Sequence, residues 1–132
     1  MKFDLSGKKA VVTGGSSGIG KAITETLQEQ GAEVFVIDLN ENPSLKKAGI
    51  HTITTDLTQW DELNASLASL PQTIDILINN AGIGFVGNIE QTEEEDFDRL
   101  YQVNVKGVFN CVKAILPRMK KQGGVIVNMA SI

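Results

Sequence analysis

Short runs of apolar residues alternate with longer amphipathic segments along this chain. The apolar runs predict β-strands at residues 10–12, 34–37, 51–54, 74–78 and 125–129. The amphipathic segments predict α-helices at residues 19–30, 44–47, 58–70 and 92–119. Pro71 closes the third of these helices, and a capping box formed by Thr92 and Glu95 marks the expected start of the fourth.

This alternation also predicts how the strands are connected. Strands that alternate with helices of this length form right-handed βαβ units and therefore a parallel sheet. The run 34–37 is continuously apolar, as expected for a strand covered by helices on both faces. We therefore predict an α/β fold, a doubly wound, Rossmann-type parallel sheet in three α/β/α layers. It occupies residues 1–132 as one domain and is expected to be truncated after its fifth strand.

Composition and charge narrow the classes of function. The 132 residues carry a net charge of −4 and no basic patch, so we expect neither nucleic acid nor an anionic membrane as a partner. No apolar run is long enough to cross a bilayer, and the first residues do not resemble a secretory signal. The lone Cys111 favours a reducing cytoplasm. The acidic run 93–96 is interpreted as a solvated first helical turn, so no metal site is expected.

A glycine-rich loop follows the first predicted strand and opens the first predicted helix. Its key glycines, Gly14, Gly18 and Gly20, bracket two serines, Ser16 and Ser17. Glycine permits a tight turn and close approach of a pyrophosphate, and the helix N-terminus adds free N–H groups and a positive dipole end. The loop therefore favours phosphate binding, with a purely structural turn as the alternative.

An acidic residue, Asp38, ends the second predicted strand about 20 residues beyond Gly18, where a dinucleotide fold places the acid that holds the adenosine ribose. A carboxylate there accepts hydrogen bonds from the ribose hydroxyls and repels a 2′-phosphate. The next residues, Leu39 and Asn40, supply no cation to receive that phosphate. We therefore expect NAD(H) to be preferred over NADP(H), with a solvated loop acid as the alternative.

Five ordered motifs resemble those of the short-chain dehydrogenase/reductase family over essentially the whole chain. The loop 13–20 resembles T-G-x-x-x-G-x-G, Asp56 resembles the acid that contacts the adenine amino group, and residues 79–82 resemble N-N-A-G. Asn104 is similar to the family's helix asparagine and Ser131 to its catalytic serine. The resemblance implies a cofactor site formed by Gly14, Ser16, Ser17, Gly18, Ile19, Gly20, Asp38, Asp56, Leu57, Asn80, Ala81 and Gly82.

The resemblance also implies an activity, the NAD(H)-dependent interconversion of an alcohol and a ketone or aldehyde. Asn104 would hold a proton-relay water and distort its helix, and Ser131 would polarise the substrate carbonyl. The family's Tyr-x-x-x-Lys pair lies beyond the serine, and the only tyrosine here, Tyr101, is followed four residues later by Val105. We therefore expect this chain to be the N-terminal half of such an enzyme and to be inactive alone.

Alternatives without a catalytic role stay open for Asn104, for Ser131 and for the chain as a whole. Asn104 falls on the apolar stripe of the helix 92–119, so it could be a buried asparagine whose amide is simply hydrogen-bonded. Ser131 could be an ordinary serine near the chain end. The whole chain could be a nucleotide-binding or oligomerising module without catalytic activity. Whether the chain is part of an oxidoreductase or a non-catalytic module, we expect it to form a homo-oligomer through the helix 92–119.

Overall fold

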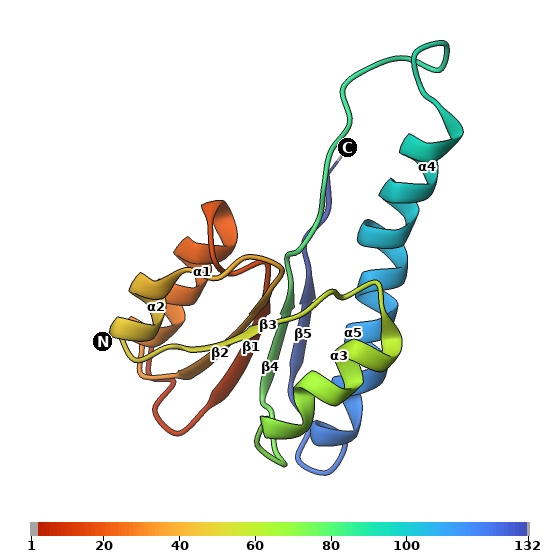
Figure 1. Cartoon of the computed structure of the whole chain (residues 1–132). Coiled ribbons are helices and arrows are strands. Elements are labelled where there is room, and N and C mark those ends of the chain that lie inside the picture. The colour runs from red at the N-terminus through yellow and green to blue at the C-terminus, as the bar shows by residue number, and fades with distance from the viewer. Residues whose placement is uncertain (1–2, 132) are drawn as a thin grey trace.

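The computed structural model describes residues 3–131, which form an open sheet of parallel strands between two layers of helices (Figure 1). The strands are β1 (Lys9–Thr13), β2 (Glu33–Asp38), β3 (His51–Thr54), β4 (Ile76–Asn79) and β5 (Val125–Asn128). Their order in the sheet is β3-β2-β1-β4-β5. Because the chain winds outward in both directions from β1, the predicted doubly wound, Rossmann-type fold is confirmed.

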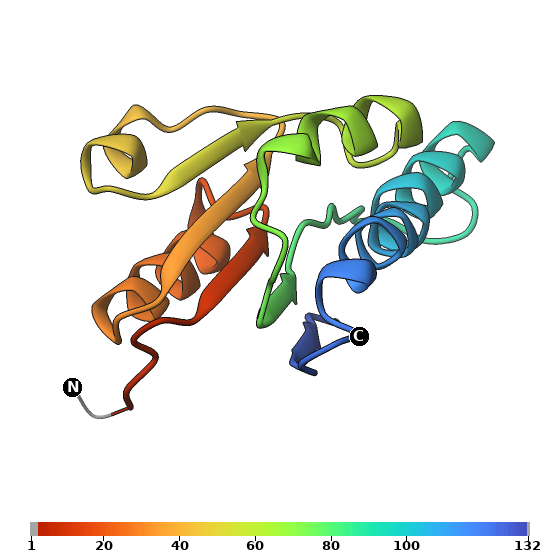
Figure 2. The same ribbon diagram turned by 90° about the horizontal axis from the view of Figure 1, so that it is seen from below.

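Helices cover both faces of the sheet, as the view from below shows (Figure 2). One face carries α1 (Gly18–Glu29) and α2 (Pro43–Lys47). The other carries α3 (Trp60–Ser66) and α5 (Gly107–Ile115), and α4 (Glu94–Tyr101) precedes α5. These layers explain why the strand sequences are apolar at successive positions, since both faces of each central strand are covered.

Two hydrophobic clusters, one on each face, hold the layers together. Val11 points into the cluster beneath α3 and α5, whereas its neighbour Val12 points into the cluster beneath α1 and α2. Leu45 fixes the short helix α2 in the second cluster. Cys111 is buried in the first cluster, and this burial raises the pKa of its thiol to about 12. The thiol therefore stays protonated and behaves as a small apolar side chain.

Several predicted boundaries need correction. The helix predicted at 58–70 begins at Trp60 and finishes as a 3₁₀ turn, Leu67–Ser69. The strand predicted at 74–78 begins at Ile76, because the Ile74 amide donates to the Arg118 carbonyl instead of to a neighbouring strand. The capping box consists of Glu93 and Asp96 rather than Thr92 and Glu95. The Thr92 hydroxyl is already used, since it donates to the Asn88 carbonyl.

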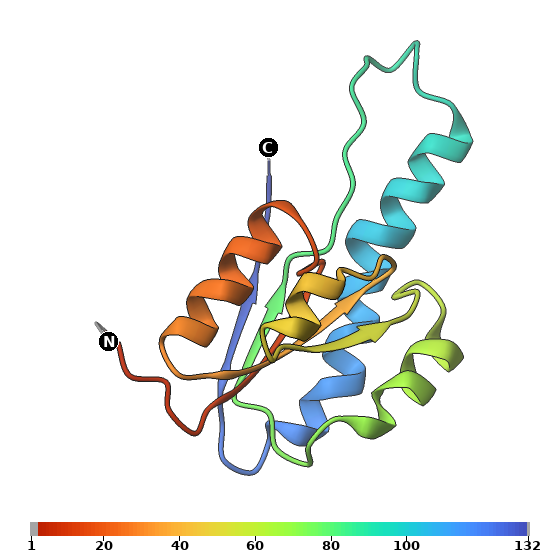
Figure 3. The same ribbon diagram turned by 60° about the vertical axis from the view of Figure 1, so that its left-hand side comes forward.

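The long helix predicted at 92–119 is interrupted. A π-helical turn, Gln102–Lys106, separates α4 from α5, and a 3₁₀ turn, Leu116–Arg118, follows α5. In Figure 3, α4 extends past the carboxyl ends of the strands together with the loop that precedes it. The apolar positions of the predicted helix are therefore buried on α5, at Cys111 and Ile115, but not on α4. On α4, Phe97 is 62% exposed and Tyr101 52% exposed.

Candidate nucleotide-binding site

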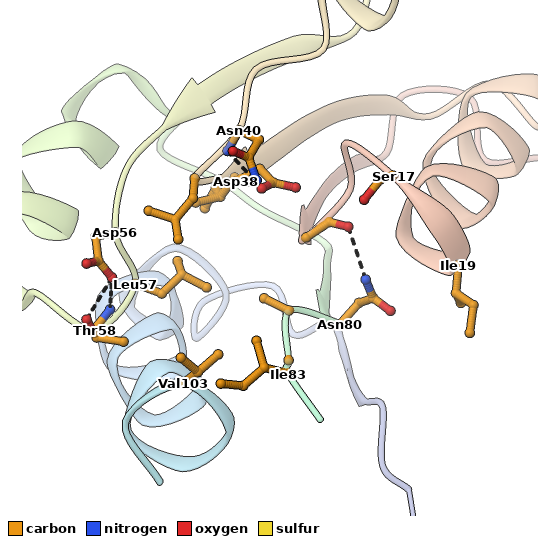
Figure 4. Close-up of a pocket in the computed structure, with 15 residues that line it drawn as sticks. Ser17, Ile19, Asp38, Asn40, Asp56, Leu57, Thr58, Asn80, Ile83 and Val103 are labelled. Atoms are coloured by element: carbon orange, nitrogen blue, oxygen red, sulfur yellow. Dashed lines mark hydrogen bonds between the residues drawn. The ribbon is translucent and has the colours of Figure 1, made fainter. Parts of the chain in front are cut away.

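A cleft of about 420 Å³ lies at the carboxyl ends of the strands, where the sheet order reverses between β1 and β4 (Figure 4). This is the position at which ligands bind in open α/β sheets. The predicted cofactor residues that line the cleft are Gly14, Ser17, Ile19, Asp38, Asp56, Leu57, Asn80, Ala81 and Gly82. The structure adds lining residues that the sequence did not single out for this role: Ile37, Leu39, Asn40, Thr58, Ile83 and Val103.

The glycine loop turns from β1 into α1 at one side of the cleft. Gly14 and Gly18 have φ values of 65° and 55°, a backbone region that favours glycine. Ser17 occupies the N-cap of α1, but its side chain makes no capping hydrogen bond. The first amides of α1 are therefore available to an anionic ligand. Gly18 and Gly20 do not line the cleft and instead shape the turn that forms it.

Thr13 joins the glycine loop to the segment that follows β4. Its hydroxyl oxygen accepts hydrogen bonds from the amides of Asn80 and Ala81, each at 3.0 Å. The Asn80 side-chain amide donates to the Gly14 carbonyl at 3.2 Å, which closes the connection from the other side. Two walls of the cleft that are distant in sequence are thereby held at a fixed spacing.

The Asp38 carboxylate lies at the mouth of the cleft between the glycine loop and the loop after β2 (Figure 4). One of its oxygens accepts from the Ser16 amide at 3.1 Å and the other from the Asn40 amide at 3.0 Å. Each carboxylate oxygen can accept a further hydrogen bond. Ser16 itself is buried and does not line the cleft, and its backbone amide is engaged with Asp38.

Asp56 lies across the cleft from Asp38, beyond β3 (Figure 4). One of its carboxylate oxygens accepts from both the amide and the hydroxyl of Thr58, at 2.9 and 2.7 Å. These bonds fix the orientation of the carboxylate. The side chains of Leu57, Ile83 and Val103 form an apolar floor beside it in Figure 4. Such a floor suits a flat aromatic group, and the acid at its rim suits an amino group.

Asn104 lies in the π-helical turn, and its side chain clamps the backbone of Ile83, in the segment after β4, with two hydrogen bonds. Its oxygen accepts from the Ile83 amide and its nitrogen donates to the Ile83 carbonyl, both at 2.8 Å. The alternative of a buried asparagine does not hold, because Asn104 is exposed, although both ends of its side-chain amide are hydrogen-bonded. Ser131 is also exposed; it follows β5 and does not line the cleft.

The comparison with protein families agrees with this geometry. The sequence profile of the short chain dehydrogenases matches residues 8–132. The chain belongs to the short-chain dehydrogenase family. Members of this family are oxidoreductases that use a nicotinamide cofactor and small-molecule substrates.

Curated relatives of this short-chain dehydrogenase carry different activities in their names. It is 40% identical to an uncharacterized oxidoreductase of Thermotoga maritima, over 98% of this chain and 55% of the relative. It is 35% identical to a 3-beta-hydroxysteroid dehydrogenase of Comamonas testosteroni, over 97% of this chain and 54% of the relative. It is 37% identical to an NAD-dependent glycerol dehydrogenase of Listeria innocua, over 98% of this chain and 54% of the relative. The chain thus spans about half the length of these relatives.

Residues 3–131 contain neither a candidate membrane span nor a candidate metal cluster. No helix in this range is long and apolar enough to cross a membrane. The same residues contain no group of three or more His, Cys, Asp or Glu side chains that could hold a metal ion.

Proposed function

We propose that this short-chain dehydrogenase binds NAD(H) in the cleft between β1 and β4, as the cofactor-binding part of an oxidoreductase that interconverts an alcohol and a ketone or aldehyde. The observation that carries the proposal is the Asp38 carboxylate, held at the mouth of the cleft by two backbone amides. The residues described as lining this cleft include no lysine or arginine. We assign this role to residues 1–132 as one domain.

The chemistry of the cleft fits the parts of a dinucleotide. The start of α1, with Ser17, Ile19 and the glycines around them, presents N–H groups to a pyrophosphate. Asp38 accepts from the adenosine ribose hydroxyls. Adenine lies on the apolar side chains, and Asp56 accepts from its amino group, beside Leu57.

The segment after β4 is the proposed wall for the nicotinamide end. Asn80, Ala81 and Gly82 line the cleft there, held by Thr13. The bound cofactor supplies or takes up the hydride. The chain's own residues bind and orient it. We further propose that Ser131 orients the substrate carbonyl and that Asn104, through its clamp on Ile83, sets the position of this wall.

Asp38 also accounts for a preference between the two dinucleotides. A 2′-phosphate at this position would meet a carboxylate at short range in a partly desolvated cleft, where like charges repel strongly. NAD(H) instead supplies hydroxyl groups, and a hydrogen bond to a charged acceptor contributes about 1.5–3 kcal/mol. The preference for NAD(H) is therefore part of the proposal, supported by one relative named as NAD-dependent.

Calorimetric titration with NADH and NADPH tests this preference. We expect the unchanged chain to bind NADH at least about tenfold more tightly than NADPH, a difference of about 1.4 kcal/mol. Asp38→Ala should lower the NADH affinity and bring the two affinities close together. Asp61→Ala removes the same charge from an exposed position on α3 outside the cleft and should change neither affinity. Equal or tighter binding of NADPH by the unchanged chain would contradict the proposal.

A second candidate function, an oligomerising module without catalysis, is favoured by an exposed apolar stripe. Exposed apolar or aromatic side chains recur every four residues from α4 to α5, at Phe97, Tyr101, Val105 and Phe109. β5 adds an exposed apolar edge. We propose that the chain forms a homo-oligomer through residues 92–119, whichever of the two functions holds. A cytoplasmic location belongs to the same proposal and rests on the single, buried Cys111.

Sedimentation velocity tests self-association. The unchanged chain is expected to sediment as a dimer or larger species at micromolar concentrations, because an apolar stripe of this length usually finds a partner. Phe109→Glu should shift the chain toward monomer. Asn64→Glu adds the same charge at an exposed position of α3 and should leave the distribution between monomer and larger species unchanged. A monomer at all concentrations for the unchanged chain would rule out the oligomer.

A further inference from the structure

The Asp38 carboxylate is hydrogen-bonded to Ser16, and Ser16 is in turn hydrogen-bonded to Asn42, which lies outside the cleft. Asp38 accepts from the Ser16 amide, and the Ser16 hydroxyl donates to the Asn40 carbonyl at 2.9 Å. The Ser16 carbonyl in turn accepts from the side-chain amide of Asn42, also at 2.9 Å. Ser16 is therefore fixed on three sides, and one of these contacts comes from Asn42, which does not line the cleft.

Asn42 is fixed at its other end by the helix α2. Its side-chain oxygen accepts from the amide of Ser44 at 3.1 Å and from the Ser44 hydroxyl at 2.7 Å, which makes it the N-cap of α2. Leu45 buries that helix in the core. A backbone amide must donate and a backbone carbonyl must accept, so the contacts with Ser44 and Ser16 fix which end of the Asn42 amide is oxygen.

We propose that Asn42 is a positioning residue for the choice between NAD(H) and NADP(H): through Ser16 it holds the Asp38 carboxylate in place for the adenosine ribose. The path runs from the buried helix α2 through Asn42 to the glycine loop, and from there to the acid. Without the Asn42 contact, Ser16 loses its link to α2, and the hydrogen bond from the Ser16 amide to Asp38 is held less firmly. The proposal rests on the proposed function, since it refines how the same cleft selects its cofactor.

Asn42→Ser separates this role from capping of α2. Serine is an equally good N-cap for α2 and introduces no charge, but its side chain is too short to reach the Ser16 carbonyl as well. We expect the NADH affinity of Asn42→Ser to fall about fivefold, within the range of a single lost hydrogen bond. The NADPH affinity should stay unchanged. A second variant, Asn42→Asp, keeps the cap and the length but removes the donor, and it should lower the NADH affinity as well.

Hydrogen exchange supplies a readout that needs no cofactor. The Ser16 amide should exchange about tenfold faster in Asn42→Ser than in the unchanged chain, because its bond to Asp38 opens more often. The Gly14 amide, which donates to the Ile37 carbonyl at 2.8 Å, serves as the internal control and should keep its protection. Ser44→Ala removes only one capping partner of Asn42 and should change neither exchange at Ser16 nor the affinity for NADH.

The outcomes separate this proposal from the proposed function. Unchanged protection at Ser16, or an equal fall of NADH and NADPH affinity in Asn42→Ser, would overturn the role of Asn42 while leaving the cofactor site standing. Failure of the unchanged chain to bind NADH would overturn the proposed function and this inference with it. Faster exchange at Ser16 together with a fall in NADH affinity alone would support the inference.

Discussion

Replacing Gly20 with alanine is expected to destabilise the chain and to abolish measurable dinucleotide binding. A β-carbon at this position would lie 2.1 Å from the Gly14 carbonyl oxygen and 2.4 Å from the side-chain nitrogen of Asn80. Gly→Ala inside a helix would otherwise stabilise it by about 1 kcal/mol. Here the clash is with backbone, which cannot move without displacing the glycine loop. Overpacking of this kind typically costs about 1–3 kcal/mol, so the net effect is destabilising.

The loss of binding should exceed the loss of stability. Displacement of a binding loop by about 1 Å can cost on the order of 100-fold in function. Urea unfolding and NADH calorimetry measure the two effects on the same protein. Gly84→Ala is the matched control, because a β-carbon there would meet nothing within 4 Å and the backbone is not in the glycine-favouring region. Normal NADH binding by Gly20→Ala would contradict the proposed packing of α1 against the loop.

A polypeptide of residues 1–132 is expected to give no turnover of NADH with ketones, aldehydes or keto acids. Hydride transfer to a carbonyl builds negative charge on oxygen, and a positioned acid must donate a proton as that charge forms. Its only tyrosine, Tyr101, is exposed on α4 and is followed four residues later by Val105, so it does not supply the Tyr-x-x-x-Lys pair that the family resemblance implies.

The expected loss of turnover is large because general acid–base catalysis and orientation of the reactants are both missing. General acid–base catalysis is typically worth about 10² to 10⁴ in rate, and orientation of the reactants can be worth more. Ser131 and Asn104 could orient a substrate but supply no acid of suitable strength. The assay follows NADH absorbance with material whose intact mass has been verified. Turnover that is lost in Ser131→Ala would show that the 132 residues do catalyse and that this account is wrong.

The fold was predictable because its signals are local and repeat along the chain. Apolar runs mark the strands, and Gly14 with its neighbours marks the turn from β1 into α1. The placement of Asp38 at the cleft also follows from sequence, since the carboxyl ends of neighbouring parallel strands meet at one edge of the sheet. The expected distortion near Asn104 coincides with the π-helical turn, and that expectation came from the family resemblance rather than from helical periodicity.

The features that the sequence did not predict depend on long-range packing. Helical periodicity places Phe97 and Tyr101 on the same stripe as Cys111, but only Cys111 lies over the sheet, so only it is buried. The apolar side chains of Ile83 and Val103 meet in the cleft because Asn104 clamps the loop to the helix. A contact of this kind, between a loop and a helix joined by side-chain hydrogen bonds, leaves no periodic pattern of apolar residues in the sequence.

The most direct test of the central claim, that the cleft between β1 and β4 binds the dinucleotide, is an NMR titration of the isotope-labelled chain with NADH. The account predicts that amide shift changes gather at residues 14–20, 38–40, 56–58 and 80–83. The turn 120–124, at the opposite end of the sheet in Figure 1, should be unaffected. Shift changes centred on that turn, or none at millimolar NADH, would contradict the account.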